Sequence, residues 1–258
     1  FAGVVPGLLL ALGNIISVVV IAWILKLPRG EFKPRRLWSE FLRAAPALGM
    51  PVVILGGLYG GVFTPTEAAA AACGYALIYG FVMERARFFA GLVPTAKRAL
   101  NLTAVVLFLV GSVGVFQFLA ANMYWPQQIT KAVTAWGLTP LTFIFAFMLV
   151  LLILGMFVDG IAMVLLTVPV VFPVASALGV DPIHLGIMLT LAVEMSVVTP
   201  PVGLNLFAVS GTSRIPVTQV LKGSVPFFLG DFIVLMLVIF FPILATWLPG
   251  QLVTTVFK

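Results

Sequence analysis

The stretch Glu194–Phe207, EMSVVTPPVGLNLF, decides how this chain folds. It lies inside an apolar run from Leu185 to Ser213 that is long enough to cross a bilayer. A Pro-Pro pair does not fit a regular helix, because each proline lacks an N–H and crowds the preceding turn. The sequence therefore predicts a transmembrane helix that breaks near the middle of the membrane. Such a break is tolerated where the exposed backbone groups line a polar cavity.

The rest of the chain has the composition of a protein that lies in lipid. Of its 258 residues, 62% are hydrophobic and 9% are charged, and the mean hydropathy is +1.22. A soluble domain of this length could not bury that much apolar surface. The apolar runs are about 20 residues long rather than about 10 with alternation, which favours helices over strands. We therefore predict an all-α, multi-pass membrane protein.

The charged residues indicate a topology rather than a nucleic-acid partner. The 14 Lys and Arg exceed the 8 Asp and Glu, but most of the basic residues are clustered between apolar spans before residue 99. The positive-inside rule places such clusters in the cytoplasm. The single cysteine, Cys73, excludes a disulfide or a cysteine metal cluster within the chain, so we expect no transition-metal site.

The basic clusters order the spans of the first half. A first span from Phe1 to Leu25 precedes a basic stretch, and Arg35–Ala45 is typical of a short amphipathic helix at the membrane interface. The next cytoplasmic cluster begins at Arg85, so the segment before it must cross twice, as a hairpin that turns at Gly56–Ala69. A further span from Ala99 to Ala121 then leads to an external loop.

The second half contains the segments with the main candidate functional residues. Leu141–Leu178 is interrupted by Asp159-Gly160 and by two prolines, and its length allows either two crossings or one re-entrant hairpin. Because the later basic residues should be cytoplasmic, we favour a re-entrant hairpin with its tip near Asp159 and a last span at Pro226–Leu248. These segments divide the chain into residues 1–50, 51–138, 139–213 and 214–258.

The two interruptions supply the groups that a sodium ion prefers. Backbone carbonyls, hydroxyls and amides at a helix break suit Na⁺, and a carboxylate in an apolar stretch is costly unless it faces a cation, a partner or water. Two simpler interpretations stay open: a proline kink with locally satisfied polar groups, and an Asp-Gly turn at the tip. The candidate sodium ligands are Asp159, Gly160, Ser196, Thr199, Pro200, Gly203 and Asn205.

Other polar residues have candidate roles outside the predicted sodium site. The substrate-site or hinge candidates are Pro201, Glu194, Thr64 and Thr66. Thr64 and Glu67 match a capping box with Pro65 as the first helical residue, which favours a structural cap there. Glu194 could serve the cation site, a proton relay or a basic partner. We expect His184 at the surface and Asp231 as an interfacial or helix N-terminal charge.

Three motifs resemble one known family over essentially the whole chain. The strings that begin at Gly56, Gly155 and Glu194, namely GGLYGGVFTPTEAAAAA, GMFVDGIAMVLLTVPVVFP and EMSVVTPPVGLNLF, resemble the large membrane subunit of tripartite ATP-independent periplasmic (TRAP) transporters. The opening FAGVVPGLLLAL also resembles that subunit just after its first half. The resemblance implies a sodium-coupled elevator transporter with two inverted repeats, each with a re-entrant hairpin and a broken helix. This chain would supply the second repeat and, through Asp159, Gly160 and Ser196–Asn205, the second sodium site.

The resemblance also implies partners and a location. We expect a small membrane subunit, a missing N-terminal half of the large subunit, and a periplasmic binding protein that delivers an organic acid such as a dicarboxylate or sialic acid. The expected location is the bacterial inner membrane, with Na⁺ as the coupling ion and no organic cofactor. An anion channel and a purely structural subunit are the alternatives. An intramembrane aspartyl protease would need two deep aspartates, and only Asp159 is predicted to be deep, so we expect no enzyme.

Overall fold

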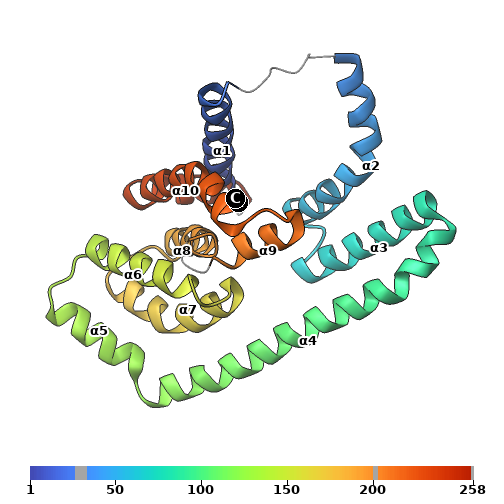
Figure 1. Cartoon of the computed structure of the whole chain (residues 1–258). Helices are drawn as coiled ribbons and strands as arrows, with labels where there is room; N and C mark the ends of the chain where they lie inside the picture. Colours follow the sequence, from blue (N-terminus) through green and yellow to red (C-terminus); the bar gives the residue numbers. More distant parts are fainter. Residues whose placement is uncertain (27–33, 200–202, 257–258) are drawn as a thin grey trace. The chain divides into compact units, whose positions relative to one another are not determined.

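A computed structural model of the chain describes residues 1–26, 34–199 and 203–256 (Figure 1). The regular structure in these ranges is entirely α-helical. The helices are α1 (Val4–Ile24), α2 (Pro34–Tyr59), α3 (Pro65–Glu84), α4 (Ala86–Asn122), α5 (Trp125–Ala135), α6 (Pro140–Gly155), α7 (Gly160–Ala177), α8 (Pro182–Ser196), α9 (Leu204–Ser213), α10 (Val217–Phe240) and α11 (Ile243–Val256). The predicted all-α fold class is confirmed.

Six of the described helices are long and apolar enough to cross a membrane: α1, α2, α3, α4, α7 and α10. Helices α6 and α8 are apolar but shorter, with 16 and 15 residues. At 1.5 Å per residue, α6 is about 24 Å long, less than the apolar core of about 30 Å. The chain is thus a multi-pass membrane protein in which some apolar helices are too short to cross alone.

The chain divides into two compact units. The hairpin unit is Pro28–Val106, and the main unit combines Phe1–Leu27 with Leu107–Lys258. In the hairpin unit, α2 and α3 pack against each other as a helical hairpin. Its turn lies between Tyr59 and Pro65 and includes Gly61, whose φ of +67° suits glycine.

The core of the main unit lies where α6, α7 and α8 pack together, side by side in Figure 1. Leu151 from α6, Met163 from α7 and Met188 from α8 are almost completely buried there. Helix α10 packs on both α8 and α1, and its Leu235 and Val238 are fully buried. A single apolar core therefore holds α6, α7 and α8 together, and α8 is the first part of the predicted broken helix.

Three predicted boundaries are wrong. The interfacial helix predicted at Arg35–Ala45 continues to Tyr59 as part of α2, although the helix contains two prolines. The Tyr75 hydroxyl of α3 donates to the Pro46 carbonyl and so ties the middle of α2 to α3. The predicted external loop contains helix α5, which packs on α7 and begins next to Pro126, a residue favoured in a first turn.

The last span also differs from its prediction. Helix α10 begins at Val217 rather than Pro226 and ends at Phe240, so Pro226 lies inside the helix. The helix ends before Phe241, whose φ of −123° and ψ of 79° are not helical. The residue that precedes a proline is biased away from helical angles, and Pro242 follows it. The end of the apolar segment forms the separate helix α11.

His184 was predicted at the surface and is instead buried, with 4% of its surface exposed. Its Nε2 lies 2.7 Å from the carbonyl oxygen of Val238 on α10. That carbonyl would normally accept from the N–H four residues later, but residue 242 is a proline and has none. The His184 ring therefore replaces the missing donor, which fixes Nε2 as the protonated nitrogen and ties α8 to α10.

A second proline in the main unit is compensated in the same way. Pro169 inside α7 cannot donate to the carbonyl of Leu165. The Gln117 side chain of α4 donates to this carbonyl through Nε2, over 3.1 Å. Side chains from other helices thus satisfy carbonyls that prolines leave without a helical partner, as expected at membrane depth.

Candidate functional site

The first element of the site is the turn between α6 and α7. Asp159 is the N-cap of α7, and its Oδ2 accepts the Ile161 N–H over 3.0 Å. An aspartate is among the preferred N-cap residues, and the positive end of the helix dipole stabilises its charge. The side chain is exposed rather than buried in the core. Both predicted roles of Asp159 therefore remain compatible, because only one of its carboxylate oxygens is used by this cap.

The second element is the break between α8 and α9, which the sequence predicts at its Pro-Pro pair. Helix α8 ends at Ser196 and α9 begins at Leu204, after Gly203 with a φ of +51°. The last turn of α8 tightens, since the Thr199 N–H donates to the Ser196 carbonyl over 3.1 Å. Across the break, the Asn205 N–H donates to the Val197 carbonyl over 3.3 Å, so the two half-helices stay connected.

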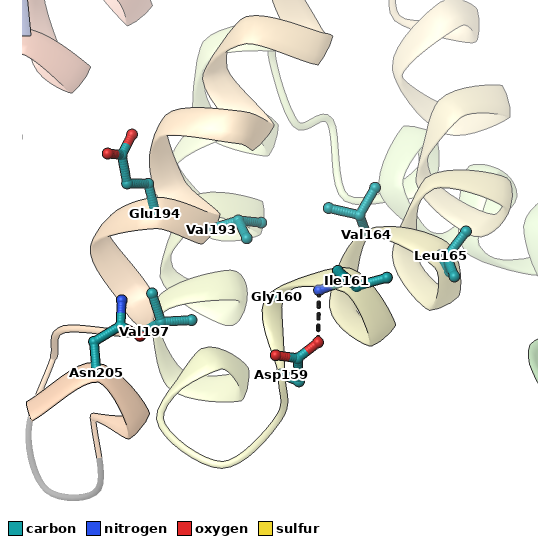
Figure 2. Close-up of a pocket in the computed structure, with 9 residues that line it drawn as sticks. All are labelled: Asp159, Gly160, Ile161, Val164, Leu165, Val193, Glu194, Val197 and Asn205. Atoms are coloured by element: carbon teal, nitrogen blue, oxygen red, sulfur yellow. Dashed lines mark hydrogen bonds between the residues drawn. The ribbon is translucent and has the colours of Figure 1, made fainter. Parts of the chain in front are cut away.

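A pocket of about 520 Å³ lies between these two elements (Figure 2). It is mainly apolar, with the polar side chains of Asp159, Glu194 and Asn205 on its lining. The lining residues are Asp159, Gly160, Ile161, Val164, Leu165, Val193, Glu194, Val197 and Asn205. A mostly apolar pocket with a few placed polar groups is the usual form of a small-ligand site.

The pocket contains some of the predicted sodium ligands and leaves out others. Asp159, Gly160 and Asn205 line it together, from the start of α7 and the start of α9. Thr199 and Gly203 lie in the break but not on the pocket lining. The Thr199 hydroxyl donates to the Met195 carbonyl over 2.8 Å, which leaves its oxygen lone pairs as acceptors.

Ser196 is fully buried behind the pocket rather than on its wall. Its hydroxyl donates to the Val193 carbonyl over 2.7 Å. A Cβ placed on Gly155, the last residue of α6, would lie 1.9 Å from the Ser196 hydroxyl oxygen. Only glycine fits at this position without a shift, and the missing side chain lets the end of α6 meet the end of α8.

Several predicted residues are not part of this pocket. Pro200 and Pro201 lie outside the described residues. Thr64 and Thr66 belong to the start of α3 in the hairpin unit. Thr64 is fully used in a capping box: its hydroxyl accepts the Glu67 N–H over 3.3 Å, and the Glu67 carboxylate accepts the Thr64 N–H over 2.8 Å. The predicted structural role of Glu67 is thereby confirmed.

Glu194 is exposed, and Figure 2 shows its carboxylate pointing away from Asp159, with Val193 and Val197 on the side of α8 that faces Asp159. Glu194 acts electrostatically on a second acidic residue, Asp231 of α10, a helix that packs on α8. Asp231 was predicted near an interface or a helix start, and it lies instead in the middle of α10. Its Oδ1 is buried and has no hydrogen-bond partner among the described residues.

The position of Asp231 inside an apolar helix could have been predicted from the sequence. It is a charged residue with apolar sequence on both sides, FFLG before it and FIVLMLVIFF after it. The apolar residues of the pocket, such as Val164 and Leu165, carry no such signal. Their positions depend on how α7 packs against α8, which the local sequence does not determine.

The donor set of the pocket fits a hard cation better than a transition metal. The Asp159 oxygen that is not used in the helix cap, the Asn205 amide oxygen and the carbonyls at the end of α8 are hard ligands. Half-helix ends of this kind coordinate Na⁺ in transporters. The described residues contain no group of three or more His, Cys, Asp or Glu side chains that could hold a metal ion. The pocket thus brings oxygen-bearing groups from two helix ends to one mainly apolar space.

The chain is similar over most of its length to proteins of one family. The family model described as "Tripartite ATP-independent periplasmic transporter, DctM component" matches residues 1–244. A C4-dicarboxylate TRAP transporter large permease protein from Vibrio cholerae is 38% identical over 97% of this chain and 60% of its own length. A sialic acid TRAP transporter large permease protein from the same species is 36% identical, over 96% of the chain and 58% of that protein.

A third relative widens the range of named substrates. An ectoine/5-hydroxyectoine TRAP transporter large permease protein from Ruegeria pomeroyi is 36% identical, over 96% of the chain and 58% of that protein. The chain thus spans about 60% of the length of the curated relatives it matches.

Proposed function

This chain belongs to the DctM component family of TRAP transporters, and we propose that it forms the sodium-coupled, substrate-handling part of a large permease that imports an organic acid. It is a transporter component in a membrane and not an enzyme. The observation that carries the proposal is the pocket between the α7 N-terminus and the α8–α9 break, which both Asp159 and Asn205 line.

The proposed sodium ligands come from the two helix ends. Asp159 supplies a negative carboxylate oxygen at the start of α7, and Asn205 and Thr199 supply neutral oxygens at the α8–α9 break. A bound Na⁺ would contribute one positive charge between half-helices that otherwise expose partial charges. Because the ligands come from separate segments, an arrangement that brings them together binds Na⁺ more tightly than one that does not. This differential affinity lets a sodium gradient bias the transport equilibrium.

The packing of α6, α7 and α8 supports an elevator motion of this part of the protein. Helices α6, α7 and α8 share one buried core, which favours their movement as a rigid body. The short α6 favours a re-entrant hairpin over two complete crossings. In the full-length protein we propose a second inverted repeat of the same kind, as inverted repeats with broken helices are common in transporters.

The names of the relatives support a proposal for the substrate class. Two of them are named for a C4-dicarboxylate and a sialic acid, so we propose an organic acid for this protein as well. We also propose that a periplasmic binding protein delivers the substrate, that a small membrane subunit accompanies the large one, and that the complex lies in the bacterial inner membrane.

The test is uptake into proteoliposomes that contain the full-length complex, with its binding protein outside. Labelled organic acids are supplied with and without an inward Na⁺ gradient. We expect uptake to require both Na⁺ and the binding protein, and Asn205→Ala to raise the Na⁺ concentration needed for half-maximal uptake. Unchanged uptake when K⁺ replaces Na⁺ would contradict the proposal, and flux without saturation would indicate a channel.

A further inference from the structure

Helices α1 and α10 of the main unit touch closely at one point and leave a groove beyond it. A Cβ placed on Gly230 would lie 3.3 Å from the Ser17 hydroxyl oxygen and 3.6 Å from the Gly13 carbonyl oxygen. The Ser17 hydroxyl donates to the Pro226 carbonyl over 3.2 Å. Small residues at a crossing let membrane helices approach closely, and a hydroxyl can then bond across them.

These contacts establish that the two helices run antiparallel. Gly13 faces Gly230, and four residues further along α1, Ser17 faces Pro226, which is four residues earlier on α10. The C-terminal end of α1 therefore lies beside the N-terminal part of α10. Both ends belong to the side of the membrane that the positive-inside rule assigns to the cytoplasm, with Lys26 after α1 and Lys222 in α10.

The groove begins beyond this crossing and has a volume of about 550 Å³. Its walls are nearly all hydrocarbon, with Ile21 and Leu25 from α1 and Pro226 and Phe227 from α10. Lys222 is the charged residue on its lining. Pro226 has no N–H for the Lys222 carbonyl, and a proline at this place favours a bend of α10 away from its neighbour.

The size of the groove decides which occupant fits. Residues 18 to 25 cover about 10 Å along α1, so the mean cross-section of the groove is about 50 Å². A helix with side chains is about 10–12 Å in diameter, which corresponds to at least about 80 Å². A helix from another subunit is therefore too thick to enter along its length. An acyl chain is thinner and has no polar backbone group to satisfy.

We propose that this groove binds one anionic phospholipid of the cytoplasmic leaflet, with an acyl chain between α1 and α10 and the phosphate at Lys222. A hydrocarbon wall with a lysine at its cytoplasmic end matches both parts of such a lipid, and basic pockets between membrane helices are known to hold anionic head groups. The proposal concerns a site separate from the α7–α8 pocket and does not depend on sodium coupling.

The experiment is native mass spectrometry of the full-length protein in detergent with added phosphatidylglycerol or phosphatidylcholine. We expect the wild type to retain phosphatidylglycerol in preference, and Lys222→Gln to reduce its retention about fivefold, the effect of about 1 kcal/mol per lysine near anionic lipid. Lys222→Arg should restore retention. Lys131→Gln, on α5 and outside the groove lining, is the matched charge control.

The uncharged part of the groove is tested by Ala22→Phe, which fills it and leaves Lys222 in place. This variant should lower the retention of phosphatidylglycerol, whereas Lys131→Gln should not. Equal retention of the two lipids by the wild type would overturn the proposal, and this measurement does not require any variant to fold. Equal losses in Lys222→Gln and Lys131→Gln would also overturn it, as would a crosslink from the groove to another polypeptide.

Discussion

The two helical hairpins of this chain, α2–α3 and α6–α7, each have an acidic residue where the second helix begins, but the two acids are used differently. Glu67 closes a capping box with Thr64, and the carboxylate accepts both the backbone N–H and the hydroxyl of Thr64, each over 2.8 Å. Asp159 accepts only the Ile161 N–H in the described structure of its hairpin. Each cap uses a single carboxylate oxygen, Oε2 of Glu67 and Oδ2 of Asp159, but Asp159 also lines a pocket together with Asn205.

The surroundings of the two turns differ in the same direction. The α6–α7 turn lies beside the buried end of α8, with Gly155 against Ser196 and Gly160 close to Val193. Thr64 and Glu67 are exposed residues of the hairpin unit. An acid at a turn therefore indicates a ligand only when packing brings a second oxygen-bearing segment to the same place. Here that segment is the start of α9, which contains Asn205.

Filling the space behind the α6–α7 turn should have the largest effect on the difference between the two hairpins. Gly155→Ala would place its Cβ about 2 Å from Ser196, so we expect a loss of about 1–3 kcal/mol in the free energy of unfolding. Unfolding of the full-length protein in detergent measures it. Adding Ser196→Gly should recover much of the loss, since it removes the side chain that is struck.

The matched control for this substitution is Gly74→Ala on α3, where an added Cβ meets nothing within 4 Å. Alanine is the better helix former by up to about 1 kcal/mol, so this variant should not destabilise the protein. Equal destabilisation by the two substitutions would refute the close packing that we describe at Gly155.

The anchoring of α8, which carries the break, can be tested at its other end. His184→Leu should cost about 1–3 kcal/mol, because it leaves the Val238 carbonyl buried without a donor. Adding Pro242→Ala restores a backbone N–H four residues after Val238 and should recover part of the loss. If Pro242→Ala gives no recovery in a double-mutant cycle, His184 does not act through that carbonyl.

The smallest expected effect lies at the α2–α3 turn. Thr64→Ala removes a side-chain cap and should lower the free energy of unfolding by about 1 kcal/mol. The Na⁺ concentration for half-maximal uptake should not change, because this turn is assigned no ligand role. Measuring both quantities on the same preparation separates them, and a clear change in sodium dependence would contradict the assignment.

Local sequence chemistry predicts the interruptions of this fold well. The Pro-Pro pair predicts the break between α8 and α9, Asp159-Gly160 predicts the turn before α7, and Thr64 with Glu67 predicts the cap of α3. Each of these features depends on backbone preferences within a few residues. The family resemblance that these motifs indicate agrees with the family to which the chain belongs.

Features that depend on distant contacts could not be predicted in this way. The burial of His184 requires the register between α8 and α10, because its partner Val238 is 54 residues away. The prolines favour helix limits near Pro46 and Pro226, yet both residues lie inside helices. The side chains that line the pocket beside Asp159 likewise become neighbours only through tertiary packing.

The central claim, that Asp159 binds sodium and Glu67 does not, is tested most directly by titrating Na⁺ into the full-length protein and two variants. Asp159→Asn and Glu67→Gln each remove one charge and keep a side chain that can still cap its helix. We predict that Asp159→Asn raises the half-saturating Na⁺ concentration about tenfold or more, equivalent to about 1.4 kcal/mol, and that Glu67→Gln leaves it unchanged. Unchanged sodium binding in Asp159→Asn, or an equal shift in both variants, would contradict the account.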